Sequence, residues 1–142
     1  MLKWIARETR SHLALTLGLK MNPSGNRPMT EAERHLAKWM LENGTPEAIE
    51  YLGQLDRAEV TPYKCPCGCA TINLQIQGHP EPPPGVHILG DFLVGYDNEI
   101  FGIFIFLSAG LLSGIEVYSL AADAPCVLPS PEQLRPCEFA KP

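Results

Sequence analysis

The spacing of apolar residues changes once along this chain, and that change is what most constrains its fold. Over residues 30–57 the apolar residues recur at helical spacing, with Leu36, Trp39 and Met40 on one stripe. Over residues 71–77 they alternate with polar residues, which is the period of a half-buried strand. The order of the two patterns predicts an α+β domain in which an N-terminal helical hairpin packs on an antiparallel sheet.

The predicted helices have clear start and stop signals. Thr30 and Glu33 have the spacing of a capping box, in which each side chain bonds the backbone of the other residue. The Asn-Gly pair at 43–44 predicts the end of this helix, because both residues tolerate left-handed backbone. The Thr-Pro-Glu sequence at 45–47 predicts a second helix directly after it.

The rest of the chain predicts about four to five strands. Four of them are expected at residues 71–77, 87–94, 99–107 and 111–120, and the last three form a meander with short turns. A fifth strand is expected at 58–63, on an edge because Pro62 lacks an amide donor. We therefore divide the chain into a basic extension and linker, 1–28, and a single α+β domain, 29–142.

The charge of the chain is distributed unevenly. The net charge is −5, yet residues 1–28 carry five basic side chains against Glu8 alone. From Cys65 to Leu134 there is no Lys or Arg. An acidic stretch of this kind repels nucleic-acid phosphates and attracts basic surfaces, so we expect no nucleic acid and a basic protein partner. A solvated acidic face that serves only solubility is the alternative.

Four residues form the candidate binding patch. Asp97 and Glu99 flank a predicted turn, and Glu116 and Tyr118 alternate with the inward-facing residues of the last strand. If the last two strands pair, the four side chains share the face away from the helices. A tyrosine among carboxylates suits recognition of a basic partner, and an ordinary solvated sheet face is the alternative.

A cluster of thiols is the most distinctive local motif. Cys65, Cys67 and Cys69 lie within one Cys-Pro-Cys-Gly-Cys sequence and could supply three ligands of a tetrahedral zinc site. The candidates for a fourth ligand are Cys126, Cys137, His79 and His87. The alternative is a tight loop in which the thiols only pack. The Cys-Pro-Cys-Gly opening resembles the zinc-binding SEC-C motif, but its later Cys-Cys or Cys-His pair has no counterpart here.

The sequence carries no recognisable catalytic machinery, and we expect the protein not to be an enzyme. The four histidines are scattered, and no nucleotide-binding glycine pattern precedes a helix. Five cysteines without a secretory signal predict a cytoplasmic protein. The uncharged run over 100–115 is shorter than the roughly 20 residues of a membrane-spanning helix, so no membrane span is expected.

Several stretches carry a family resemblance. They are the Met-Thr-Glu-Ala-Glu-Arg sequence at 29–34, the cysteine cluster, the Leu-Ser-Gly-Ile-Glu-Val-Tyr-Ser sequence at 112–119, and the proline-punctuated segment at 128–136. In these stretches the chain resembles a group of small bacterial α+β proteins without an assigned activity. Its residues 113–119 are also similar to the final strand of some immunity-type proteins that neutralise polymorphic toxins. The resemblance implies an immunity or antitoxin-like binding protein, and an exposed edge strand could in addition support a homodimer.

Overall fold

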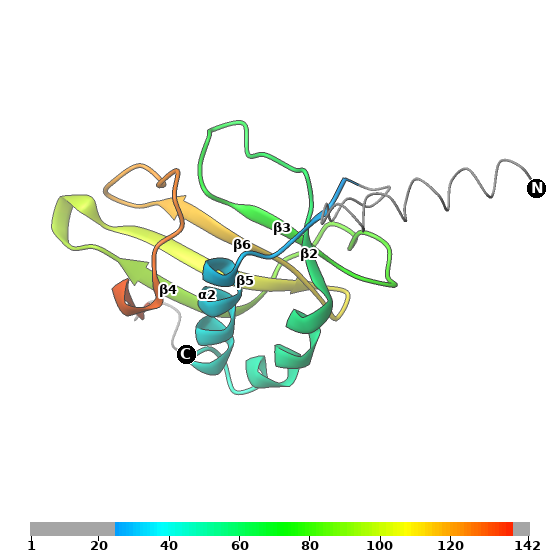
Figure 1. Ribbon diagram of the computed structural model, residues 1–142. Helices are drawn as coiled ribbons and strands as arrows, with labels where there is room; N and C mark the ends of the chain where they lie inside the picture. The colour runs from blue at the N-terminus through cyan, green and yellow to red at the C-terminus, as the bar shows by residue number, and fades with distance from the viewer. Residues whose placement is uncertain (1–24, 138–142) are drawn as a thin grey trace, which may run out of the picture.

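The computed structural model describes residues 25–137, which form an α+β fold around one seven-stranded antiparallel sheet. The α-helix α2 and the 3₁₀ segment η1 cover one face of this sheet (Figure 1). The elements in chain order are β1 (Arg27–Pro28), α2 (Glu31–Glu42), η1 (Ala48–Arg57), β2 (Ala58–Val60), β3 (Ile72–Ile76), β4 (His87–Val94), η2 (Asp97–Glu99), β5 (Phe101–Ser108), β6 (Leu111–Ser119), η3 (Pro131–Gln133) and β7 (Leu134–Pro136).

The predicted capping box starts α2. The Thr30 hydroxyl accepts a hydrogen bond from the Glu33 amide at 3.1 Å, and the Thr30 amide donates to Glu33 Oε1 at 2.8 Å. Arg27 adds two parallel bonds to the same carboxylate, at 2.9 and 2.8 Å. Burial alone would raise the pKa of Glu33, but these donors hold it below its ordinary value. The segment before the helix is therefore fixed to its first turn.

The second predicted helix is a 3₁₀ segment, η1, rather than an α-helix. Glycine at position 53 disfavours a continuous α-helix in the middle of this segment. The Gln54 side chain donates to the Gly110 carbonyl at 3.0 Å and accepts from the Leu112 amide at 2.8 Å. It thereby fixes η1 to the turn between β5 and β6.

The sheet has the order β1-β2-β3-β6-β5-β4-β7, so the expected number of strands, four to five, is too low. The predicted meander is confirmed, since β4 pairs with β5 and β5 pairs with β6. The strand expected at 58–63 is β2, which lies inside the sheet because β1 covers its outer edge.

The two outermost strands were missed because they are too short to show any alternation. They have two and three residues, and each ends on a proline, Pro28 or Pro136. The pairing of β1 with β2 also corrects the predicted domain boundary, since residues 27–28 belong to the sheet and not to a linker. The remainder of the predicted extension, residues 1–24, lies outside the described residues.

The core lies between the helical layer and the sheet. It contains alternate side chains of each central strand, among them Leu74, Ile103, Ile105 and Ile115, which are at most 1% exposed. Between residues 25 and 137 no helix is both long enough and apolar enough to cross a membrane.

The open face of the sheet is built from aromatic rings that lie over glycines. Tyr118 is opposite Gly102 and Phe106 is opposite Gly114 in the β5–β6 register. A Cβ at Gly102 would lie 2.0 Å from the Tyr118 ring, and one at Gly114 would lie 2.8 Å from the Phe106 ring. Phe104 lies between the two aromatic rings, with centroid distances of 5.8 and 5.7 Å. Three aromatic rings therefore lie together on this face, and no helix of the described residues covers it.

Candidate metal centre in the cysteine loop

The three clustered cysteines lie in the connection between β2 and β3. The Gly68 amide donates to the Cys65 carbonyl at 2.9 Å, which closes a turn around Pro66 and Cys67. Gly68 has a φ of +82°, which a residue with a side chain rarely adopts. The turn gathers the sulfur atoms of Cys65, Cys67 and Cys69 within 4.8 Å of one another.

Contacts within the loop orient these thiols. The Sγ atoms of Cys65 and Cys67 are 3.0 Å apart, and the Cys69 amide donates to Cys67 Sγ at 3.4 Å. Cys69 Sγ lies 3.3 Å from the Thr71 hydroxyl oxygen, which accepts a hydrogen bond from the Val117 amide at 3.1 Å. Thr71 thereby links the thiol cluster to β6, the central strand of the sheet.

The thiols differ in acidity. Hydrogen bonding to Cys65, and then to Cys69, raises the pKa of Cys67 to about 11. Slight burial would raise the pKa of Cys69, but hydrogen bonds from Thr71 and from the neighbouring thiols lower it to about 7. The loop therefore holds one readily formed thiolate, the form of cysteine that binds metals.

The spacing of the sulfurs fits a thiolate metal site. In a tetrahedral zinc site with Zn–S bonds of about 2.3 Å, neighbouring sulfurs are about 3.8 Å apart. The sulfurs of Cys65, Cys67 and Cys69 bracket this value, with one pair at 3.0 Å and none beyond 4.8 Å. All five cysteines of the described residues are free thiols. The loop can therefore reach the geometry of a zinc site with shifts of about 1 Å.

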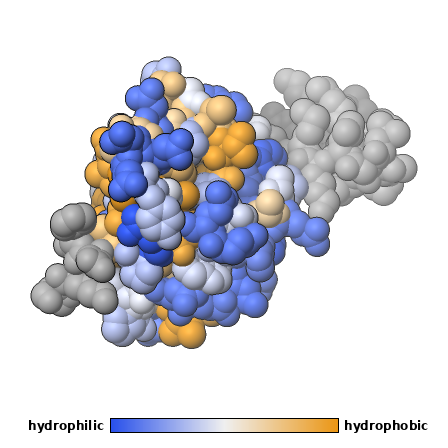
Figure 2. Space-filling model, turned by 90° about the vertical axis from the view of Figure 1, so that its left-hand side faces the viewer, coloured by the Kyte–Doolittle hydropathy of each residue, from blue (hydrophilic) through white to orange (hydrophobic). Residues whose placement is uncertain are grey.

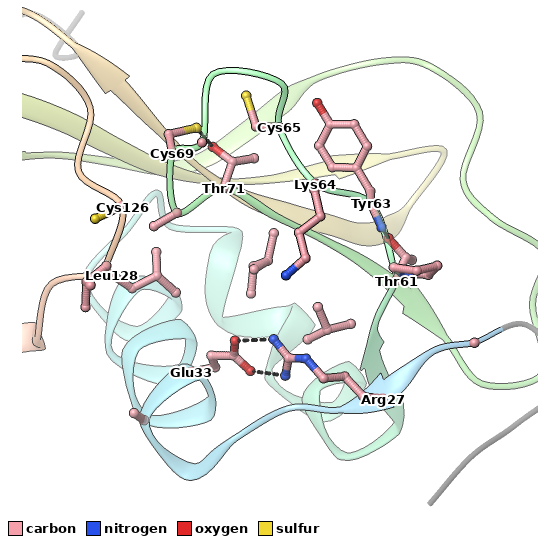
Figure 3. Close-up of a pocket in the computed structure, with 18 residues that line it drawn as sticks. Arg27, Glu33, Thr61, Tyr63, Lys64, Cys65, Cys69, Thr71, Cys126 and Leu128 are labelled. Atoms are coloured by element: carbon pink, nitrogen blue, oxygen red, sulfur yellow. Dashed lines mark hydrogen bonds and ion pairs between the residues drawn. The ribbon is translucent and has the colours of Figure 1, made fainter.

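The cysteine loop borders a groove of about 650 Å³ (Figure 3). Cys65 and Cys69 line it from one side, the Arg27–Glu33 pair closes its opposite side, and the exposed Lys64 side chain points into it. The remaining labelled lining residues are Thr61, Tyr63, Thr71, Cys126 and Leu128. The Lys64 ammonium points toward the Arg27–Glu33 side of the groove, away from the thiols (Figure 3).

The four candidates for a fourth ligand lie in different parts of the fold. Cys126 lines the groove together with Cys65 and Cys69. Cys137 is buried after β7, where its amide donates to the Asp91 carbonyl at 3.3 Å. The His87 ring is bonded to Glu47 at 2.5 Å, and the His79 amide closes a turn on the Ile76 carbonyl. Of the four, Cys126 alone lines the groove beside the cluster.

The predicted acidic patch is divided between two places. Glu116 and Tyr118 lie on the open face of the sheet, opposite Phe104 and Gly102. Asp97 and Glu99 are exposed in η2, in the connection between β4 and β5. That connection is the yellow-green end of the sheet in Figure 1, and the view onto this side in Figure 2 mixes hydrophilic and apolar residues. The basic partner stays a prediction.

Sequence reasoning missed a hydrogen bond on the open face. The Tyr118 hydroxyl donates to Asp91 Oδ1 at 2.8 Å. Burial raises the pKa of Asp91 above its ordinary value, although the Tyr118 bond opposes this shift. The two residues lie on β4 and β6 with β5 between them, so nothing in their local sequence could have paired them.

Asp91→Asn should increase stability at neutral pH. A carboxyl with a raised pKa stabilises the fold below its unfolded pKa, and that contribution is lost as the pH rises through the folded pKa. The amide stays neutral and can still accept from Tyr118. Urea unfolding should give the variant a higher free energy of unfolding than the wild type at pH 7. This difference in free energy should narrow below about pH 4. Asp123→Asn, at an exposed position, is the control; a variant less stable than wild type at pH 7 would contradict the argument.

Comparison of this chain with protein families, with curated proteins and with solved structures finds no match. The resemblance to small bacterial proteins and to immunity-type proteins stays a prediction.

Proposed function

We propose that the protein is a small metal-binding module that holds a single soft metal ion, Zn²⁺ in the first place, through Cys65, Cys67 and Cys69. The observation that supports this proposal is the gathering of three free thiols within 4.8 Å on one loop. Three thiolates select zinc or another soft cation over magnesium and calcium, which prefer oxygen ligands.

The surroundings of the thiols suit this role. The turn closed by Gly68 brings the three sulfurs to the same side of the loop. Thr71 orients Cys69, as the hydrogen-bonding partners of metal ligands commonly do. The same threonine is fixed to the backbone of β6, so a bound ion would link the cysteine loop to the central sheet.

Such a site is expected to be structural or regulatory rather than catalytic. A zinc ion with four protein ligands stabilises the fold and a catalytic one keeps a position open for water, so the three thiols fit either kind and the groups around them favour the first. No histidine of the described residues lines the groove, and its carboxylate, Glu33, is bonded to Arg27 on the side opposite the thiols, so neither is placed there to act as a general base. The prediction that the protein is not an enzyme agrees with this proposal.

Metal titration of the reduced full-length protein tests the proposal. We expect the wild type to take up about one Zn²⁺ per chain, measured against a chromophoric chelator and by native mass spectrometry. The triple variant Cys65→Ser/Cys67→Ser/Cys69→Ser should take up none, while Cys137→Ser, which removes a thiol elsewhere, should bind like the wild type. Absence of zinc binding by the reduced wild type would refute the proposed function.

A further inference from the structure

The cysteine cluster provides three ligands, and the identity of the fourth decides what the site does. A fourth protein thiolate would give a closed structural site, and a water molecule or small ligand would give an open one. The groove beside the cluster could accommodate either, since its volume of about 650 Å³ exceeds that of a water molecule many times.

The chain segment that carries Cys126 lies against the segment that carries Cys69. The Ala70 amide donates to the Pro125 carbonyl at 2.8 Å. This bond places the residue after Cys69 beside the residue before Cys126. Figure 3 shows Cys69 and Cys126 on the same side of the groove, on neighbouring stretches of chain.

Cys126 lies in an irregular connection at the surface. Its thiol is exposed, and the segment around it consists of bends without a helix or strand. Its sulfur lies outside the set that is within 4.8 Å, so it must move to bind. A change of rotamer moves a cysteine sulfur by about 3 Å without any change in the backbone.

We propose that Cys126 is the fourth ligand, so that a bound Zn²⁺ clasps the segment between β6 and η3 onto the cysteine loop. This inference rests on the proposed function. Four thiolates complete a tetrahedral site, and the ion joins two connections that are far apart in the sequence. Metal binding then closes the side of the groove that these connections form.

Cobalt substitution of the full-length protein measures the number of thiolate ligands directly. We expect the wild type to show the spectrum of a tetrahedral Co²⁺ site. In Cys126→Ser the sulfur-to-cobalt charge-transfer band should fall by about a quarter, for three thiolates in place of four. Zinc affinity should fall at least about 100-fold, since the loss of an outer-shell partner alone costs 10–100-fold. Cys137→Ser should match the wild type in both measurements.

A rescue variant and a second readout separate ligation from a general effect on the loop. Cys126→His should restore tight binding with a blue-shifted spectrum, because imidazole is also a zinc ligand. Hydrogen exchange should show zinc-dependent protection of the amides of residues 120–128 in the wild type and in Cys137→Ser, and none in Cys126→Ser.

The outcomes also separate this inference from the proposed function. If the wild type binds about one zinc and Cys126→Ser keeps the same affinity and the same cobalt spectrum, the clasp is refuted while the three-thiol site stands. The fourth position would then be open to the groove. If the reduced wild type binds no zinc at all, the proposed function and the clasp both fail.

Discussion

Addition of Zn²⁺ to the reduced protein should raise its midpoint of thermal unfolding by roughly 10–15 °C. A ligand that binds only the folded state stabilises it by mass action, by about 4 kcal/mol at a free concentration of 1,000 times the dissociation constant. The fold holds the three thiols at a common spacing, so we expect the unfolded chain to bind the ion more weakly. Differential scanning calorimetry with and without zinc measures the shift.

Cys67→Ser should abolish this rise, since it removes the middle ligand of the loop. The position is exposed, so without zinc the variant should unfold close to the wild-type temperature. The shift in the wild type should also shrink as the pH is lowered, because protons compete with the ion for all three thiolates. Equal shifts in the wild type and in Cys67→Ser would show that zinc binds elsewhere.

Gly44→Ala should destabilise the fold by roughly 3 kcal/mol. A Cβ at this position would lie 2.1 Å from the Leu89 carbonyl oxygen and 2.9 Å from the Met40 carbonyl oxygen. Both atoms are backbone, so no side chain can turn aside to make room. The end of α2 would have to withdraw from β4 and lose the bond from the Thr45 amide to the Leu89 carbonyl, now 2.7 Å. The midpoint of urea unfolding measures the loss.

Gly53→Ala is the matched control for this substitution. A Cβ at Gly53 would meet no heavy atom within 4 Å, and the residue lies in the 3₁₀ segment η1. The stability of this variant should be unchanged or higher by up to about 1 kcal/mol, because alanine has less freedom than glycine in the unfolded chain. If the two variants lost similar stability, the close approach of α2 to β4 could not be the cause.

The elements that were predictable from the sequence depend on local chemistry. The capping box of Thr30 and Glu33 and the β4–β5–β6 meander are visible in neighbouring residues and are confirmed. The strands β1 and β7 were not predictable, since two or three residues ending on a proline show no period. Their place is fixed by pairing with distant strands.

The candidate site also has a part that local sequence predicts and a part that it does not. The spacing of Cys65, Cys67 and Cys69 already indicates a shared ion, because a tight turn brings such close neighbours together. The approach of Cys126 depends on how the chain returns after β6, and no local pattern encodes that path. The Asp91–Tyr118 bond depends on the strand order in the same way.

The Tyr118 ring that lies over Gly102 on the open face makes these two positions interdependent. Any side chain at Gly102 would displace the ring of Tyr118, whereas a side chain at Gly114 would meet the backbone carbonyl of Ile72 as well as the ring of Phe106. Conversely, a small residue at either aromatic position would leave the backbone at the glycine uncovered. A side chain at Gly102 therefore requires a smaller residue at position 118, whereas Gly114 is also restricted to glycine by the backbone of β3.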